Sequence, residues 1–356
     1  MSLSKHAVLV VAALLAFAVC VALYIRFTRT PTNVAYVSEE DGGISVIDLN
    51  TLKVVKRVHP KNVGPRGIAI TFDGNYLFTA NKDTADATVF KTRGLKLLKR
   101  IPVGDNPEFV KIGPSGKWIY TSFEPGSTGG PPTEGEEEGE SNPSEPPAEI
   151  VSFNTGDWSR GKSFTAGQET EGIEFSADGE QLVVANEAQN TLGVYDVETG
   201  ALSKEVNLIS YGRRPRGVKL APQGDRYAVT MEGSGTLLLL DQKFNVLKSV
   251  STAAKPYGVA FDHLGKRIFV AAAAAHEFQV YSADSLQLLG ETPVGKRCWH
   301  FTLTPDDSKI LLACGRSDNV YVIDANTYKP ITVIGGFHTP WGIITYPRAY
   351  GSLGLP

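Results

Sequence analysis

The sequence predicts an all-β fold built from repeats of one module. The segment Pro65 to Asn81 contains two short apolar runs, Gly67 to Phe72 and Tyr76 to Ala80, joined by Asp73-Gly74. Asp-Gly between β-prone runs favours a tight hairpin, because glycine accepts the positive φ that such turns require. The opening triplet of this hairpin recurs along the chain, with 42, 63, 45, 41, 42 and 42 residues between successive third members. A period near 42 residues with several short strands per period predicts a β-propeller with one four-stranded blade per repeat.

The number of triplets gives the number of blades, because each triplet starts an innermost strand. They are Pro65-Arg66-Gly67, Pro107-Glu108-Phe109, Thr170-Glu171-Gly172, Pro215-Arg216-Gly217, Pro256-Tyr257-Gly258, Cys298-Trp299-His300 and Pro340-Trp341-Gly342. The N-terminal segment supplies the strands Val34 to Ser38, Ile44 to Asp48 and Lys53 to Val58, and Trp341 to Tyr346 supplies their missing inner strand. We therefore predict a seven-bladed ring closed by one C-terminal plus three N-terminal strands, which removes two exposed strand edges.

Length and charge narrow the classes of function. At 356 residues the chain could hold two domains, but blades cannot bury their faces singly and must close into one ring. The formal net charge is −3 and no basic run exceeds Lys-Arg, which disfavours nucleic-acid binding. The three cysteines form no disulfide framework, although Cys298 and Cys314 start and end the two strands of one hairpin. They are candidates for a cross-strand disulfide in an oxidising compartment, or for two small buried hydrophobes.

Residues 1–30 are predicted to be a membrane anchor. Ala7 to Ile25 is an uninterrupted apolar run of 19 residues, which at helical rise spans ~29 Å and is enough to cross a bilayer core. The alternative is a cleaved secretory signal, which favours a shorter apolar core and an Ala-x-Ala-like end. A short N-terminus before a large domain favours export, so we expect a single-pass protein of the bacterial inner membrane. Its propeller, residues 31–348, would lie in the periplasm, followed by a tail at 349–356.

The long step of 63 residues contains an insertion, Glu124 to Ala148. It is rich in Gly, Pro, Glu and Ser, so it cannot bury apolar area, and we predict disorder. The insertion lies between the second and third strands of its blade, which places an acidic flap on the same face as the triplets. The alternative is a tolerated surface insertion without a role.

The middle triplet residues are the candidate ligand- or partner-binding site. They should crowd round one end of the central channel, and they are Arg66, Glu108, Glu171, Arg216, Tyr257, Trp299 and Trp341. The first four would form two neighbouring opposite-charge pairs, and the three aromatic residues would fill the other side. Such a mouth could bind a planar or anionic group through arginine and tryptophan. The alternatives are that these ion pairs and aromatic side chains merely plug the channel, or that they dock a partner protein.

Metal, cofactor and catalytic signals are weak. His59, His276, His300 and His338 fall on the same face as the triplets and are the candidate metal ligands. They lack the spacing of a known metal motif, so we predict no metal and no cofactor. The sequence has no Gly-x-Ser-x-Gly elbow, no phosphate-binding glycine loop and no evident nucleophile paired with a base.

The repeats resemble YVTN-type propellers. Ala35-Tyr36-Val37-Ser38, Val184-Ala185-Asn186 and Val46-Ile47-Asp48 are similar to the strand signatures of that family. The order of the triplets resembles the bacterial propellers associated with PQQ-dependent catabolism, which are exported proteins encoded beside PQQ-dependent alcohol oxidation systems. The docking repeats of PQQ dehydrogenases are missing, so the chain does not resemble the quinoprotein itself. It departs from the associated family in the insertion, the anchor-like N-terminus, His300 and Tyr257.

This resemblance leads to a first hypothesis for the function. It implies a non-enzymatic, membrane-anchored periplasmic propeller that binds or scaffolds a protein partner in quinoprotein or cytochrome-linked oxidation. One alternative is a propeller enzyme, either a lactonase-like hydrolase or a d1-haem-like oxidoreductase. Another is a structural subunit of a membrane complex.

Overall fold

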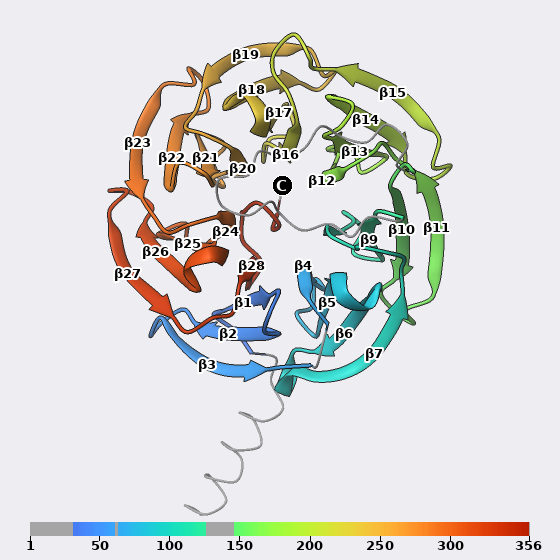
Figure 1. Ribbon diagram of the computed structural model, residues 1–356, viewed down its shortest axis with the longest axis vertical. Helices are drawn as coiled ribbons and strands as arrows, with labels where there is room; N and C mark the ends of the chain where they lie inside the picture. Colours follow the sequence, from blue (N-terminus) through green and yellow to red (C-terminus); the bar gives the residue numbers. More distant parts are fainter. Residues whose placement is uncertain (1–30, 61–62, 126–145, 356) are drawn as a thin grey trace, which may run out of the picture.

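Seven four-stranded antiparallel sheets surround one central channel in the computed structural model, which describes residues 31–60, 63–125 and 146–355 (Figure 1). The predicted seven-bladed propeller is confirmed. The innermost strands are β4 (Pro65–Ile70), β8 (Val110–Ile112), β12 (Thr170–Phe175), β16 (Pro215–Leu220), β20 (Pro256–Phe261), β24 (Cys298–Leu303) and β28 (Pro340–Tyr346). The second strands are β1 (Val34–Glu39), β5 (Tyr76–Asn81), β9 (Trp118–Phe123), β13 (Gln181–Asn186), β17 (Arg226–Met231), β21 (Arg267–Ala272) and β25 (Lys309–Cys314).

The outer half of each blade is equally regular. The third strands are β2 (Ile44–Asp48), β6 (Asp86–Lys91), β10 (Glu149–Asn154), β14 (Thr191–Asp196), β18 (Thr236–Asp241), β22 (Glu277–Ser282) and β26 (Asn319–Asp324). The outermost strands are β3 (Lys53–Val58), β7 (Lys96–Pro102), β11 (Arg160–Thr165), β15 (Leu202–Asn207), β19 (Val246–Ser251), β23 (Leu288–Pro293) and β27 (Pro330–Gly335). Four short 3-10 turns accompany them: η1 (Lys82–Thr84), η2 (Arg93–Leu95), η3 (Glu232–Ser234) and η4 (Gly315–Ser317).

The ring closes as predicted, with one blade built from both ends of the described chain. Its strand order is β28-β1-β2-β3, and β28 (red) lies beside β1 (blue) in Figure 1. The two strands pair antiparallel, with Tyr36 opposite Ile344 and Val37 opposite Ile343. This pairing completes the seventh four-stranded sheet, so that β28 and β1 do not remain as unpaired strands at the two ends of the ring.

The core lies between neighbouring blades, because each sheet packs both of its faces. Phe269 and Phe278 of one blade meet Phe301 of the next, with ring centroids 6.4 and 4.9 Å from that of Phe301. All three side chains are buried, whereas the outermost strands are largely exposed. Strands buried on both faces explain the nearly continuous apolar runs that the sequence shows.

The first hairpin differs from its prediction by two residues at the turn. β4 starts at Pro65 and ends at Ile70, so Thr71 and Phe72 belong to the turn. The Thr71 hydroxyl accepts a hydrogen bond from the Tyr76 amide (3.1 Å) and donates to Asp73 (2.6 Å). These side-chain bonds add to the backbone bond from the Thr71 amide to the Tyr76 carbonyl (3.0 Å), which is the usual role of Thr and Asp in turns.

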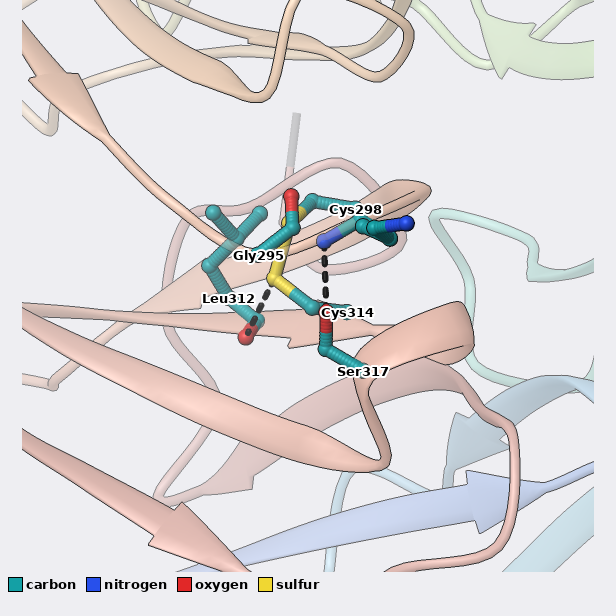
Figure 2. Close-up of a disulfide and its surroundings, with 6 residues drawn as sticks. Gly295, Cys298, Leu312, Cys314 and Ser317 are labelled. Carbon is teal, nitrogen blue, oxygen red and sulfur yellow. Dashed lines mark hydrogen bonds between the residues drawn. A yellow bond between two sulfur atoms is a disulfide. The ribbon is translucent and has the colours of Figure 1, made fainter. Parts of the chain in front are cut away.

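Of the two alternatives for Cys298 and Cys314, the structure has the disulfide (Figure 2). These residues face each other at one end of the β24–β25 pair, and both are fully buried. Close by, the hydroxyl of Ser317 accepts a hydrogen bond from the Lys296 amide (2.6 Å). The disulfide therefore links the start of β24, the inner strand that carries Trp299 and His300, to the end of β25 in the same blade.

Two sequence predictions fall on residues that the structure does not describe. The predicted anchor, Ala7 to Ile25, lies outside the described ranges, as does most of the predicted acidic flap. The flap joins β9 to β10, so it connects the second and third strands of its blade as predicted. Within residues 31–60, 63–125 and 146–355, no helix is long and apolar enough to cross a membrane.

The segment after β28 enters the channel. Figure 1 shows this segment (dark red) curling toward the centre of the ring. It runs beside β24, where the Leu303 amide donates to the Tyr350 carbonyl (2.8 Å) and the Ser352 amide donates to the Phe301 carbonyl (3.0 Å). The sequence indicates only a short tail here, and the structure shows that this tail lines the channel.

Candidate functional site

The seven predicted mouth residues lie together, buried at one end of the channel. Six of them are the second residue of an inner strand, whereas Glu108 precedes the shorter strand β8 by two residues. The residue just before each triplet has a positive φ between 45° and 56°. In five blades, a register shift then separates the triplet from the regular ladder. Bulges of this kind re-aim side chains, which turns the middle residues toward the mouth.

Both predicted ion pairs are present. Arg66 lies 3.3 Å from the Glu108 carboxylate, and Arg216 lies 2.8 Å from the Glu171 carboxylate. Arg66 also contacts Glu40 at 3.0 Å, a residue that the sequence analysis did not single out. The charged residues thus pair within the mouth, as the triplet order predicts.

A second ring of residues was missed, although its signal is present in the sequence. The residue that follows the second strand of each blade lies next to the triplets; this ring is Glu40, Lys82, Glu124, Glu187, Glu232, Ala273 and Gly315. The steps between these positions are 42, 42, 63, 45, 41 and 42 residues, the same period as the triplets. Applying the same period to the residue after each second strand would have revealed four additional carboxylates at the mouth.

One arginine is the centre of the densest part of the mouth, which we call the Arg216 cluster: Arg216, Glu171, Glu187, Glu232 and Tyr257. Arg216 Nη1 donates to Glu187 (2.8 Å) and Glu232 (2.6 Å). Its Nη2 donates to Glu171 (2.8 Å) and to the Tyr257 hydroxyl (2.6 Å). The guanidinium also lies 3.9 Å from the centre of the Tyr257 ring. All five side chains are buried, so these contacts act in a medium of low dielectric.

Glu187 also pairs with Arg214, but Arg216 is shared among three buried carboxylates, and Glu171 shows the consequence. Burial raises the pKa of Glu171 well above its ordinary value, helped by the charges of Glu108 and Glu187 and opposed by Arg216. A carboxyl group in this state can hold a proton near neutral pH and give it to a reacting group.

Aromatic rings fill the centre of the channel beside this cluster. The His300 ring lies 5.4 Å from Phe109, 5.2 Å from Tyr257 and 4.4 Å from Trp341, measured between ring centroids. Phe109 and His300 are the third residues of their triplets, where the other five blades have glycine. Those glycines are needed where blades converge, because a Cβ on Gly172 would lie 2.3 Å from the carbonyl oxygen of Arg216. The Phe109 and His300 rings therefore occupy space at the channel centre that the five glycines, which have no side chain, leave empty.

Trp299 lies apart from this group. A Cβ added to Gly315 would lie 1.7 Å from the Trp299 ring, so the indole packs against the start of η4. Trp299 thus borders the mouth within its own blade, whereas Trp341 reaches His300.

His300 is held on one side only. Its Nδ1 lies 3.1 Å from the Ser352 hydroxyl, and its Nε2 is buried without a hydrogen-bond partner among the described residues. Burial lowers the pKa of His300 well below 6.5, helped by the charges of Arg216 and Lys219. The imidazole is therefore neutral near pH 7, with one ring nitrogen unprotonated.

A small cavity separates the Arg216 cluster from Ser352. It has room for roughly one water molecule. Its lining consists of Phe109, Gly172, Ile173, Arg216, Gly217, Val218, Tyr257, Gly258, Val259, His300 and Ser352. The cavity thus brings a neutral histidine, a guanidinium and a phenol to one enclosed space.

The four candidate metal ligands do not converge. His300 is buried at the channel centre, and His59 and His338 are exposed, with ring centroids 6.3 Å apart. His276 lies on the turn after β21. In the part of the chain that the structure describes, no group of three His, Cys, Asp or Glu side chains could hold a metal ion.

The buried His300 should make stability depend on pH. Its pKa is depressed in the folded state, so below about pH 6.5 the unfolded chain takes up a proton that the folded chain refuses. The free energy of unfolding should fall by as much as about 1.4 kcal/mol per pH unit from this residue alone. Urea unfolding between pH 7 and pH 5 should show this loss in the wild type and a smaller one in His300→Asn. The exposed His59→Asn variant should keep the wild-type slope, and equal slopes for all three proteins would contradict the assignment.

Comparison with known proteins gives one family match and a set of similar folds. The family model of the lactonase, 7-bladed beta-propeller, matches residues 152–261. No curated protein matches the sequence. A functionally unknown protein from Desulfotomaculum acetoxidans has a TM-score of 0.73 at 15% identity, with 88% of this chain and 98% of that chain covered.

Two other similar structures carry lactonase names. A candidate 6-phosphogluconolactonase from Bacteroides uniformis has a TM-score of 0.71 at 14% identity, with 88% of this chain and 99% of that chain covered. The periplasmic gluconolactonase of Pseudomonas aeruginosa has a TM-score of 0.69 at 15% identity, with 87% and 98% covered. At such identities the likeness shows the propeller fold and nothing finer.

These findings correct the first hypothesis for the function. The prediction of a non-enzymatic scaffold for quinoprotein or cytochrome-linked oxidation is wrong, because the family match favours the lactonase-like alternative. The resemblance misled because its strand signatures are shared by many propellers, whatever their chemistry. The finer resemblance to PQQ-associated propellers, the membrane anchor, the periplasmic location and the protein partner stay predictions.

Proposed function

We propose that the channel mouth hydrolyses a lactone, a cyclic ester, to the corresponding hydroxy acid. The observation that carries this proposal is the position of the family match, residues 152–261, which includes every member of the Arg216 cluster. A match to a lactonase model over the blades that build a buried, polarised cluster supports an enzymatic role for that cluster. Sites rather than folds decide function, so the residues must also provide the chemistry.

The reaction needs a base, an electrostatic partner for the developing oxyanion and an acid. Neutral His300 can accept a proton at Nε2 from a water molecule as that water attacks the carbonyl carbon. Arg216 and the Tyr257 hydroxyl supply positive charge and a hydrogen-bond donor for the tetrahedral oxyanion. The bond between the carbonyl carbon and the ring oxygen then breaks, and protonated Glu171 can donate a proton to that oxygen. The product is a hydroxy acid, and the catalytic groups exchange their protons with water afterwards.

Unsatisfied polar atoms in the cluster indicate what kind of lactone would bind. Within the described residues, Arg216 Nε, Glu171 Oε2 and Glu232 Oε1 are buried without hydrogen-bond partners. Buried polar atoms are normally paired, so such atoms point to a polar ligand or to water. With Glu171 protonated, these atoms offer two donors and one acceptor, which suit a ligand that carries hydroxyl groups. Trp341 and Phe109 supply apolar surface for its ring. We therefore expect a hydroxylated lactone whose ring binds outside the cavity, because the cavity has room for only about one water molecule.

The experiment follows acid release from δ-gluconolactone in a pH-stat, corrected for spontaneous hydrolysis. The wild-type protein should accelerate acid release, and His300→Asn should lower kcat/KM by about 10²- to 10³-fold because the base is lost. His263→Asn is the matched control, since His263 lies on the opposite face and pairs with Asp307. A wild-type rate no greater than that of buffer with this lactone and with a set of other hydroxylated lactones would overturn the proposal.

A further inference from the structure

The segment after β28 delivers one hydroxyl group to the catalytic histidine. Ser352 lies beside β24, and its Oγ is 3.1 Å from Nδ1 of His300. The two residues are separated by 52 positions, so neither local sequence nor the blade period links them. Both side chains line the cavity described above.

The hydrogen bonds around Ser352 indicate which atom donates and which atom accepts in each contact. The Phe301 amide donates to Ser352 Oγ (3.0 Å), and Ser352 Oγ donates its only proton to the Phe301 carbonyl (3.1 Å). A hydroxyl group has one donor and two acceptor sites, so the remaining site of Ser352 must accept. With the hydroxyl proton directed at the Phe301 carbonyl, Nδ1 of His300 carries the proton in this contact. The opposite tautomer requires the hydroxyl to turn toward Nδ1 and leaves the Phe301 carbonyl with its bond from the Ser352 amide (3.0 Å). Because one nitrogen of a neutral imidazole is protonated and the other is not, Nε2 is left as the basic atom.

The segment is firmly held in this place by charge. The Gly354 carbonyl accepts hydrogen bonds from Lys111 Nζ (3.1 Å) and Lys219 Nζ (3.0 Å). Both lysines also pair with Glu174, at 2.9 and 3.2 Å. These three side chains are buried, and Leu353 packs in the hydrophobic core. Such anchoring fixes the Ser352 hydroxyl in one orientation rather than leaving it on a loose end.

We infer that Ser352 is a positioning residue, which holds His300 as the Nδ1-protonated tautomer with its basic Nε2 free for the reaction. This inference rests on the proposed function for its catalytic meaning, but the hydrogen-bond arrangement stands independently. Ser352 does not act as the nucleophile, because its proton is donated to the Phe301 carbonyl and its oxygen accepts two hydrogen bonds.

The first test is spectroscopic and needs no substrate. In ¹⁵N NMR of the full chain labelled at histidine, His300 should show a protonated Nδ1 and an unprotonated Nε2, assigned by comparison with His300→Asn. In Ser352→Ala the fraction of His300 that is protonated at Nδ1 should fall. In Ser352→Thr this fraction should return to the wild-type value, because the hydroxyl group is retained. Ser152→Ala is the matched control, since Ser152 of β10 is buried and donates to the Lys162 carbonyl of β11 (3.1 Å). An unchanged His300 spectrum in folded Ser352→Ala would overturn the inference.

The second test measures lactone hydrolysis. Ser352→Ala should lower kcat by about 10- to 100-fold with little change in KM, since the hydroxyl group orients the base without touching the substrate. Ser352→Thr should recover most of that loss, and Ser152→Ala should behave as wild type. An acyl adduct on Ser352 in mass spectra of quenched reactions would overturn the positioning role in favour of a nucleophile. If the wild type hydrolyses no lactone but the tautomer responds as expected, the proposed function fails and the positioning of His300 stands.

Discussion

Replacing Arg216 with methionine is expected to lower kcat/KM for the lactone by about 10²- to 10³-fold, as removal of one oxyanion donor does in other hydrolases. The same change leaves Glu171 and Glu232 buried without their cation, whereas Glu187 keeps its ion pair with Arg214. Breaking a buried ion pair costs about 3–5 kcal/mol. The variant should therefore also unfold at a lower urea concentration. Its carboxylates can escape this penalty only by taking up protons, so the variant should become less stable as pH rises from 5 to 8.

Arg216→Lys separates the two effects. A lysine keeps the positive charge but cannot donate in the planar fork that contacts Glu187, Glu232, Glu171 and Tyr257, so stability should largely recover while activity stays low. The matched control is Arg226→Met, because Arg226 lies at the start of β17 and pairs with the exposed carboxylate of Asp284. Exposed pairs contribute about 0–1 kcal/mol, so this control should be nearly neutral. Wild-type hydrolysis in Arg216→Met would remove the cluster from the mechanism.

The sequence predicts those features that repeat with the blades. The period of the triplets gives the number of blades, the closing pair of β28 and β1, and the neighbours of Arg66 and Arg216 around the ring. The second ring of residues, from Glu40 to Gly315, has the same period and was accessible to the same argument. Repetition carries this information because equivalent positions in successive blades occupy equivalent places round one axis.

Features that occur once could not be predicted in this way. The contact of Ser352 with His300 joins the segment after the last repeat to one blade, and no period relates their positions. The protonation state of Glu171 depends on how many carboxylates contact Arg216. That number follows from interatomic distances, which the order of the residues round the ring does not give. Sequence alone placed His300 among scattered candidate metal ligands, because its burial between Phe109, Tyr257 and Trp341 is a property of the closed channel.

Replacing Gly172 with alanine should destabilise the ring and the site together. The added Cβ would lie 2.3 Å from the Arg216 carbonyl oxygen and 3.0 Å from the Val218 amide nitrogen, both backbone atoms of the neighbouring inner strand. Neither atom can move away as a flexible side chain could, so β12 and β16 must separate. Overpacking of this kind costs about 1–3 kcal/mol, and we expect the upper end of that range.

The displacement should also reach the chemistry, because the clashing carbonyl belongs to Arg216 itself. A shift of β16 relative to β12 lengthens the contact between Arg216 and Glu171, so kcat/KM should fall in Gly172→Ala under conditions where the variant is folded. Gly335→Ala is the matched control, since no atom lies within 4 Å of the position its Cβ would take. Urea unfolding and lactone hydrolysis are then measured for both variants. An effect seen in Gly172→Ala and not in Gly335→Ala is due to the close approach of the inner strands and not to the added methyl group as such. If both glycine variants unfold at the same urea concentration, the tight contact between blades is not what aligns the Arg216 cluster.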